Sequence, residues 1–197
     1  NVVAGTALTA VEPVITISEG ATITPTGAQD LSAPKVYTVV SEDKTVSLDW
    51  TITITKLPAE LMSIHDVQYT TDANGNSPYN GKIVRIEGVV TAVDLLDATN
   101  TKNNFFVQDA ATEWSGIYVY SAPQAVSVGN KVEIEGTISE YKNLTEISYV
   151  TVTVKEASAS LPEAIEVAAI EDLKAEKYEG VLVKLTQETS CKTATVT

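Results

Sequence analysis

The feature that most constrains the fold of this chain is a series of short strand-like runs, broken by glycine, between residues 81 and 147. Two of the runs are long and have a central glycine: GKIVRIEGVVTAV (81–93) contains Gly88, and VSVGNKVEIEGTISEY (126–141) contains Gly136. A glycine in mid-strand allows the sharp bend with which one strand joins two sheets. The pattern therefore predicts a small, strongly curved, five-stranded β-barrel.

Shorter runs supply the rest of this region. FFVQD (105–109) and GIYVY (116–120) lie between the two long runs and have the length of short strands. Further on, AIEDLKAEKY (169–178) has apolar residues at helical spacing and predicts a short helix, which the strand YEGVLVKL (178–185) follows. We place the barrel domain at residues 62–190.

The first 57 residues contain a two-residue alternation of apolar and polar side chains. Apolar side chains recur at every second position at Val46, Leu48, Trp50, Ile52 and Ile54. Such alternation indicates a strand with one buried face, and a polar turn joins it to KVYTVV (35–40) as a hairpin. VITIS (14–18) and ATITP (21–25) suggest a second pair of strands. Several short strands with polar turns predict a small β-sandwich over residues 1–57.

Pro58 marks the boundary between the two parts, because proline interrupts a strand ladder and the alternation ends there. Just beyond it, Ser63 is placed to cap a short helical turn that carries Ile64 and Val67. The chain is therefore predicted to be all-β with one or two short helices, a sandwich followed by a barrel.

The hairpin YTVVSEDKTVSLDWTITITK (37–56) resembles the last hairpin of the immunoglobulin-like modules that precede functional domains in surface proteins of Bacteroidetes-type bacteria. The similarity covers roughly the first quarter of the chain. In that family the module is a spacer or stalk. The resemblance thus implies an Ig-like sandwich with an architectural role.

The barrel region resembles a second family. The segments that carry the likeness are SPYNGKIVRIEGVVTAV (77–93), FFVQD (105–109), GIYVY (116–120), VSVGNKVEIEGTISEY (126–141), TEI (145–147) and YEGVLV (178–183). Their order and spacing are similar to the oligonucleotide/oligosaccharide-binding-fold (OB-fold) domain beside the catalytic domain of secreted bacterial nucleases, and to related domains of Bacteroidetes surface lipoproteins. The resemblance implies an OB-fold-like barrel and a nucleic-acid partner. The metal-dependent phosphodiesterase domain that this family places next is absent from the sequence.

The charge of the chain opposes that partner. There are 13 basic and 26 acidic residues, and the formal net charge of -13 repels phosphate backbones and anionic membranes. The bases that could meet phosphate are Lys82, Arg85, Lys102 and Lys142. Because phosphate binding normally needs a clustered basic stripe, we favour a scattered, solvated face for them. Arg85 is the exception worth testing, although an ion pair with Glu87 or Glu135 would also explain it.

Residue types for catalysis or metal binding are few. Cys191 is the only cysteine, which excludes an intrachain disulfide, and His65 is the only histidine. The stretch at 72–76, Asp-Ala-Asn-Gly-Asn, has the side chains of a calcium loop, but its glycine falls two places early and a polar turn fits better. Glu140 and Glu146 are not assigned as a catalytic pair. We therefore expect no enzyme, metal or cofactor within this chain, and a catalytic domain would lie outside it.

A barrel of this kind holds sugar or nucleotide units by stacking their rings on aromatic side chains. Alternation places Tyr118 and Tyr120 on one face, either as an exposed platform or as buried sheet. Phe105 and Phe106 point in opposite directions, so one of them belongs to the core. Trp114 is expected to cover part of the core. The ligand-binding candidates are Tyr118, Tyr120, Arg85, Phe105, Trp114, Tyr141 and Lys142, and the aromatic set also contains Phe106 and Tyr149.

Together these features predict a non-catalytic ligand-binding module of a bacterial cell-surface or secreted protein, with single-stranded nucleic acid as the partner that the nuclease resemblance implies. The alternative is a glycan-binding or purely architectural module of a surface glycan-utilisation protein, which the net charge and the spacer favour. No apolar run is long enough to span a bilayer. We expect a monomer at the cell surface or outside the cell, anchored as an outer-membrane lipoprotein.

Overall fold

The computed structural model describes residues 2–94 and 103–186. The chain divides into two compact units, residues 1–58 and 59–197, and each is described by itself. Lys102 and Cys191 lie outside the described residues. Within the described ranges, every helix is too short or too polar to cross a bilayer.

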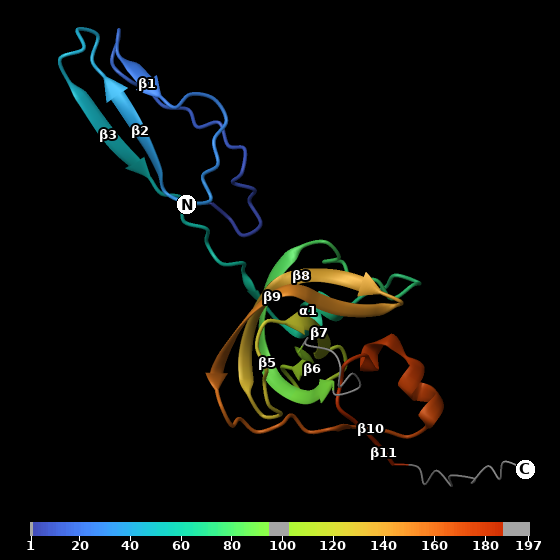
Figure 1. Cartoon of the computed structure of the whole chain (residues 1–197). Coiled ribbons are helices and arrows are strands. Elements are labelled where there is room, and N and C mark those ends of the chain that lie inside the picture. Colours follow the sequence, from blue (N-terminus) through green and yellow to red (C-terminus); the bar gives the residue numbers. More distant parts are fainter. Residues whose placement is uncertain (1, 95–102, 187–197) are drawn as a thin grey trace, which may run out of the picture. The chain divides into compact units, whose positions relative to one another are not determined.

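The first unit contains one antiparallel sheet in the order β1-β2-β3 (Figure 1). Its strands are β1 (Thr22–Thr24), β2 (Lys35–Val40) and β3 (Ser47–Ile52). The predicted hairpin of β2 and β3 is confirmed, with Tyr37 opposite Trp50. The second predicted pair is wrong, because residues 14–18 form no strand and β1 pairs with the end of β2 instead. Since β3 occupies only one edge of β2, the other edge is open to β1.

The apolar face of β3 is less buried than its alternation predicts. Leu48 and Trp50 are 55% and 62% exposed, whereas Ile52 is half-buried. Residues 2–58 form no second sheet that could cover this face. The Ig-like sandwich therefore stays a prediction, and only the three-stranded sheet is established.

The second unit is built around a closed barrel of five strands. These are β5 (Ile83–Asp94), β6 (Asn103–Gln108), β7 (Gly116–Ala122), β8 (Lys131–Tyr141) and β9 (Leu144–Glu156). They pair in the order β5-β6-β7-β9-β8, and β8 pairs back with β5. Only β7 and β9 run parallel among these neighbours. The predicted all-β class, with a closed five-stranded barrel and a separate N-terminal sheet, is confirmed.

The two central glycines lie where neighbouring strands pack closely. β5 pairs with β8 over its first half and with β6 over its second, and the change occurs at Val89. A Cβ on Gly88 would lie 2.9 Å from the carbonyl oxygen of Gln108, and a Cβ on Gly136 would lie 2.7 Å from Cγ1 of Val150. A larger residue at either position would therefore open the barrel.

Alternate residues of the five strands fill the barrel with branched and aromatic side chains. The largest fully buried apolar side chains of this core are Phe105, Ile64, Ile86, Ile117, Ile134, Ile138 and Ile147. Burying each contributes roughly 1.5–3 kcal/mol. Ile64 comes from helix α1 (Ile64–Gln68), and the predicted cap is confirmed because Oγ of Ser63 accepts the N–H of Asp66 at 3.0 Å.

Short elements flank the barrel. Ahead of it, β4 (Leu61–Met62) pairs in parallel with β5. After it, β10 (Ile165–Val167) and β11 (Val183–Leu185) form a two-stranded parallel sheet of their own. The predicted closing strand over residues 178–185 is thus shorter than expected and pairs with β10 rather than with the barrel.

The helix predicted over residues 169–178 is two separate 3₁₀ turns, η1 (Ile170–Lys174) and η2 (Glu176–Tyr178). Ala175 between them is extended, with φ −72° and ψ 131°. The extended residue breaks the helical hydrogen bonding, so each turn ends after a few residues.

Candidate functional site

A hollow of about 530 Å³ lies beside the turn that joins β8 to β9, and we call it the hairpin hollow. Its lining includes side chains from three neighbouring strands, namely Tyr120, Ser139, Glu140, Tyr141, Glu146, Ser148 and Tyr149. Its volume falls within the range of about 300–1,000 Å³ that is typical of ligand pockets. The hollow combines tyrosine rings with hydroxyl and carboxyl groups.

The floor of the hairpin hollow is polar. The hydroxyl oxygens of Ser139 and Ser148 are 3.1 Å apart, and Oγ of Ser139 donates to Oε1 of Glu146 at 3.3 Å. Glu146 is only 8% exposed. Burial raises its pKa, the hydrogen bond from Ser139 opposes the rise, and the charge of Glu140 adds to it. The floor therefore offers hydroxyl groups and carboxylate lone pairs to a ligand.

The rim of the hollow is aromatic. Tyr149 is 91% exposed, Tyr141 is 58% exposed and Tyr120 is half-buried. The register of β8 and β9 shifts between Glu135 and Thr137, which leaves a bulge in β9. Tyr149 lies in that bulge with φ +52°, a conformation that side chains other than glycine adopt at a cost. Bulges redirect side chains, and this one presents the Tyr149 ring to solvent.

The predicted aromatic candidates of β6 and β7 separate into core and surface. Phe105 is fully buried, so its prediction as a ligand-binding residue is wrong: it is the member of the pair that alternation sends into the barrel. Phe106 points outward. The centroid of its ring lies 4.9 Å from that of Tyr118, its cross-strand neighbour. Tyr118 and Tyr120 are both half-buried on this outer face. Of the two predicted alternatives, an exposed platform therefore describes Tyr118 and Tyr120 better than a buried part of the sheet.

Arg85 makes structural contacts. Its Nε donates to the carbonyl oxygen of Ala59 at 2.9 Å, and its Nη1 lies 3.2 Å from Oε2 of Glu133. The carboxylate partner is Glu133, not Glu87 or Glu135 as predicted. Glu135 accepts the N–H of Ala59 instead, at 2.7 Å. Arg85 does not line the hairpin hollow.

Two further candidates lie outside the hairpin hollow. Lys142 and Asn143 form the two-residue turn between β8 and β9, with φ +52° and +63°, and Lys142 Nζ lies 5.2 Å from the ring centroid of Tyr141. Trp114 is half-buried in the loop before β7, edge-on to Tyr69. The partly buried side chains that pack against the barrel core are Met62, Tyr79, Val93 and Val126, so the predicted cover by Trp114 is wrong.

The sequence did not reveal the floor of the hollow. Alternation places Glu146 on an outer face, where charge is normally solvated, and Ser139 and Ser148 carry no motif. The available signal is positional: Ser139 lies opposite Glu146, and Thr137 opposite Ser148. Such a cluster becomes visible only when the strand register is known.

The loop at residues 72–76 is a polar turn, as predicted. Oδ1 of Asp72 accepts the backbone N–H of Asn74 at 2.9 Å and the side-chain amide of Asn76 at 3.2 Å. In residues 2–94 and 103–186, no three histidine, cysteine or acidic side chains are grouped to hold a metal ion.

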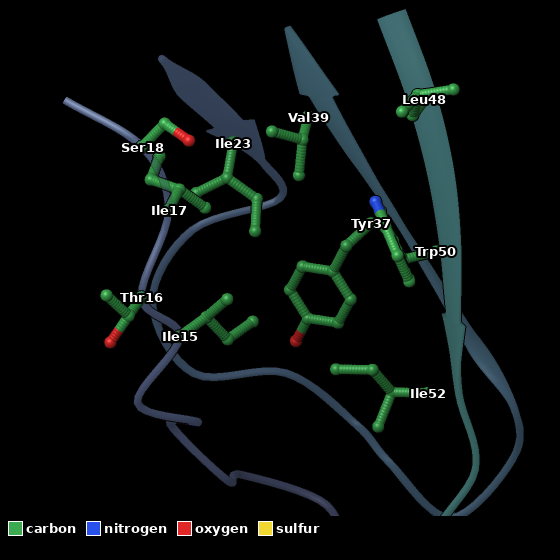
Figure 2. A pocket seen from close by; sticks show the side chains of 10 residues that line it. All are labelled: Ile15, Thr16, Ile17, Ser18, Ile23, Tyr37, Val39, Leu48, Trp50 and Ile52. Atoms are coloured by element: carbon green, nitrogen blue, oxygen red, sulfur yellow. The ribbon is translucent and has the colours of Figure 1, made fainter. Parts of the chain in front are cut away.

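The first unit has a hollow of a different character. Figure 2 shows Ile15, Ile17 and Ile23 facing β2 and β3 across a space of about 440 Å³. Tyr37 points its ring into this space and is only 2% exposed. Its hydroxyl lacks a hydrogen-bond partner among the described residues. Apart from Thr16, Ser18 and the Tyr37 hydroxyl the lining is apolar. It therefore suits apolar groups better than a sugar, most of whose hydroxyls would stay unpaired.

Comparison with known proteins bears on this first unit. Residues 1–54 match the family model described as "SGBP, N-terminal". The match ends just before the boundary between the units at residue 58. No curated protein matches the chain.

Proposed function

We propose that this chain is a non-catalytic, glycan-binding part of a bacterial cell-surface protein, and that the hairpin hollow holds the oligosaccharide. Support comes first from the family match, since SGBP denotes surface glycan-binding proteins of Bacteroidetes. In this proposal residues 1–57 are the spacer, residues 62–190 are the OB-fold-like binding domain, and the protein acts as an outer-membrane lipoprotein and a monomer.

The observation that carries the assignment to the hairpin hollow is the exposed Tyr149 ring beside the buried Glu146 carboxyl. A pyranose ring has one apolar C–H face and a rim of hydroxyl groups. The C–H face suits the electron-rich face of a tyrosine ring, and the hydroxyls can donate to Glu146 and exchange hydrogen bonds with Ser139 and Ser148. The hollow contains both requirements side by side.

Single-stranded nucleic acid is the second candidate. The adjacent rings of Phe106 and Tyr118 on the outer face of β6 and β7 favour it, because bases stack on such rings. The hairpin hollow opposes it, since Glu140 and Glu146 line that site and the chain carries a net charge of -13. The family match also favours glycan over nucleic acid.

The test is binding of the full chain to a glycan array, followed by calorimetry with the best neutral oligosaccharide. Replacing Tyr149 with alanine is expected to weaken binding about tenfold or more, taking for the sugar ring the roughly 1–3 kcal/mol that one stacking ring contributes to the binding of a nucleobase. Tyr149 is almost fully exposed, so the fold should not change. Trp50→Ala is the matched control, because it removes an exposed ring from the other unit.

Two results would contradict the proposal. One is unchanged glycan affinity in Tyr149→Ala and Tyr141→Ala. The other is tighter binding to a single-stranded oligonucleotide than to any glycan on the array, with affinity that falls steeply as salt rises.

A further inference from the structure

Three aromatic rings meet on the barrel unit without sharing a residue with the hairpin hollow. The rings of His65 and Tyr69 are stacked, with centroids 5.5 Å apart and planes 9° from parallel. Trp114 packs edge-on against Tyr69 at 5.6 Å. Tyr69 is 50% exposed. The cluster joins helix α1, the residue that ends it, and the loop before β7.

Trp114 lines two hollows. One, of about 550 Å³, also contains His65, Thr112 and Glu113. The other, of about 380 Å³, is polar, and its lining includes Asp72, Asn74, Asn143, Lys174 and Glu176. One face of the cluster therefore adjoins amide, ammonium and carboxylate groups.

The loop that carries Trp114 is held in place. Trp114 has φ +65°, and its backbone N–H donates to the carbonyl oxygen of Lys177 at 2.8 Å. Lys177 Nζ also lies 2.7 Å from Oε1 of the neighbouring Glu113. The fully buried Ser115 donates through Oγ to the carbonyl oxygen of Ala110 at 2.7 Å. A side chain in the left-handed region is strained, and such strain persists where surrounding contacts fix it.

The chemistry of the cluster identifies a class of ligand. An indole ring offers a large flat face to the C–H face of a sugar. The amides of Asn74 and Asn143 both donate and accept, as sugar hydroxyls require. The lining contains one basic residue, Lys174, together with the acidic Asp72 and Glu176. The site is therefore not a basic stripe of the kind that binds a polyanion.

We infer that Trp114, with Tyr69 packed edge-on against it, forms a second carbohydrate-binding site, separate from the hairpin hollow and selective for neutral oligosaccharides. The inference shares its ligand class with the proposed function and rests on it for that class, but not for the location. Two sites on one small domain would raise the apparent affinity for a long polysaccharide through avidity.

The test uses Trp114 as its own reporter. The chain has two tryptophans, so Trp50→Phe leaves Trp114 as the only one. The full chain with this change is titrated with neutral hexasaccharides from β-glucan, xylan and mannan, and tryptophan fluorescence is followed. We expect a saturable change in intensity and wavelength. The same titrations are followed by calorimetry in the Trp114→Gly and Tyr69→Ala variants.

Trp114→Gly removes the ring while suiting the backbone, because glycine adopts φ +65° without strain. We expect it to fold and to lose about tenfold to a hundredfold in affinity at this site, as removal of one stacking ring does. Tyr69→Ala changes a residue outside the Trp114 loop, and it provides the test if Trp114→Gly does not fold. Lys44→Gly, at φ +60° in the first unit, is the matched control for the backbone change.

The outcomes separate the two proposals. Suppose that calorimetry detects glycan binding, but Trp114 fluorescence does not change and Trp114→Gly binds with the same affinity. That result overturns this inference and leaves the proposal for the hairpin hollow intact. If calorimetry detects a single binding event and the Trp114 fluorescence response is the same in Tyr149→Ala, the result supports this site and overturns the hairpin hollow. Binding to no member of the panel overturns both.

Discussion

Gly116 lies directly against the backbone of Gly180. A Cβ built on Gly116 would meet the carbonyl group of Gly180 and come within 2.7 Å of the Val181 nitrogen. The contact brings the first residue of β7 against the segment between η2 and β11. Next to it, the backbone N–H of Leu182 donates to Oε1 of the buried Gln108 at 2.8 Å. The C-terminal segment is thus attached to the barrel by close backbone packing.

Replacing Gly116 with alanine should therefore displace this segment. We expect a loss of about 1–3 kcal/mol in the free energy of unfolding, the usual cost of adding a methyl group to a packed site. Urea denaturation and hydrogen exchange of residues 180–182 measure it. Gly81→Ala is the control: its Cβ meets nothing within 4 Å, and only its φ of +78° costs energy. Normal protection of residues 180–182 in Gly116→Ala would contradict the attachment.

The pKa of Glu179 predicts a pH dependence of the same segment. Burial raises the pKa of Glu179 to about 7, the hydrogen bond from the N–H of Thr145 opposes the rise, and the charges of Glu176 and Glu140 add to it. Its pKa in the unfolded chain is near 4.5. The folded state thus prefers the protonated carboxyl, and this contribution is full below pH 4.5 and is lost as pH rises through about 7.

The expected loss between pH 5 and pH 8 is roughly 1–2 kcal/mol once solvent screening is allowed for. Denaturation at a series of pH values in the wild type and in Glu179→Gln isolates it from Glu146, whose pKa is also raised but which does not act on Glu179. The difference in unfolding free energy between the two should change over this interval. A constant difference would show that Glu179 has an ordinary pKa.

The barrel could be predicted from the sequence because its signals are local. Alternation and the central glycines Gly88 and Gly136 are visible in single segments and are confirmed by the pairing of β5 and β8. The C-terminal elements could not, because β11 pairs with β10 through residues about 18 positions apart, which no periodicity reveals. The exposed face of β3 was mispredicted for a related reason: alternation shows that a face is apolar, not that anything covers it.

The candidate site was predicted in part. Outward-facing tyrosines follow from alternation, and Tyr120 and Tyr141 do line the hairpin hollow. The floor depends on three strands meeting in one register, and the exposure of Tyr149 depends on a bulge opposite Gly136. Both arise from pairings between distant segments, so neither residue pattern stands out in the sequence.

Arg85 should matter for stability and not for ligand binding. Arg85→Ala removes the ion pair with the half-buried Glu133 and the hydrogen bond to the carbonyl oxygen of Ala59. We expect a loss of about 1–3 kcal/mol in unfolding free energy, because the carbonyl oxygen of Ala59 loses its donor, while Glu133 keeps its ion pair with Lys155 at 3.2 Å. Lys184→Ala is the control, since its pair with Glu166 is exposed and surface pairs contribute about 0–1 kcal/mol. A weaker affinity for glycan or oligonucleotide in folded Arg85→Ala would instead place Arg85 at a binding surface.

Tyr37 provides a prediction for the first unit. Its ring is buried beside the apolar hollow of Figure 2, while its hydroxyl lacks a partner among the described residues. Leaving a buried hydroxyl unpaired costs about 1–3 kcal/mol, so Tyr37→Phe should keep the packing and raise the unfolding free energy, by about 1 kcal/mol. Tyr37→Ala, which also removes the ring, should lower it by about 3–5 kcal/mol. Urea denaturation followed by Trp50 fluorescence in a Trp114→Phe background reports this unit alone. A destabilised Tyr37→Phe would mean that the hydroxyl has a hydrogen-bond partner in solution, since removing an unpaired group cannot weaken the fold.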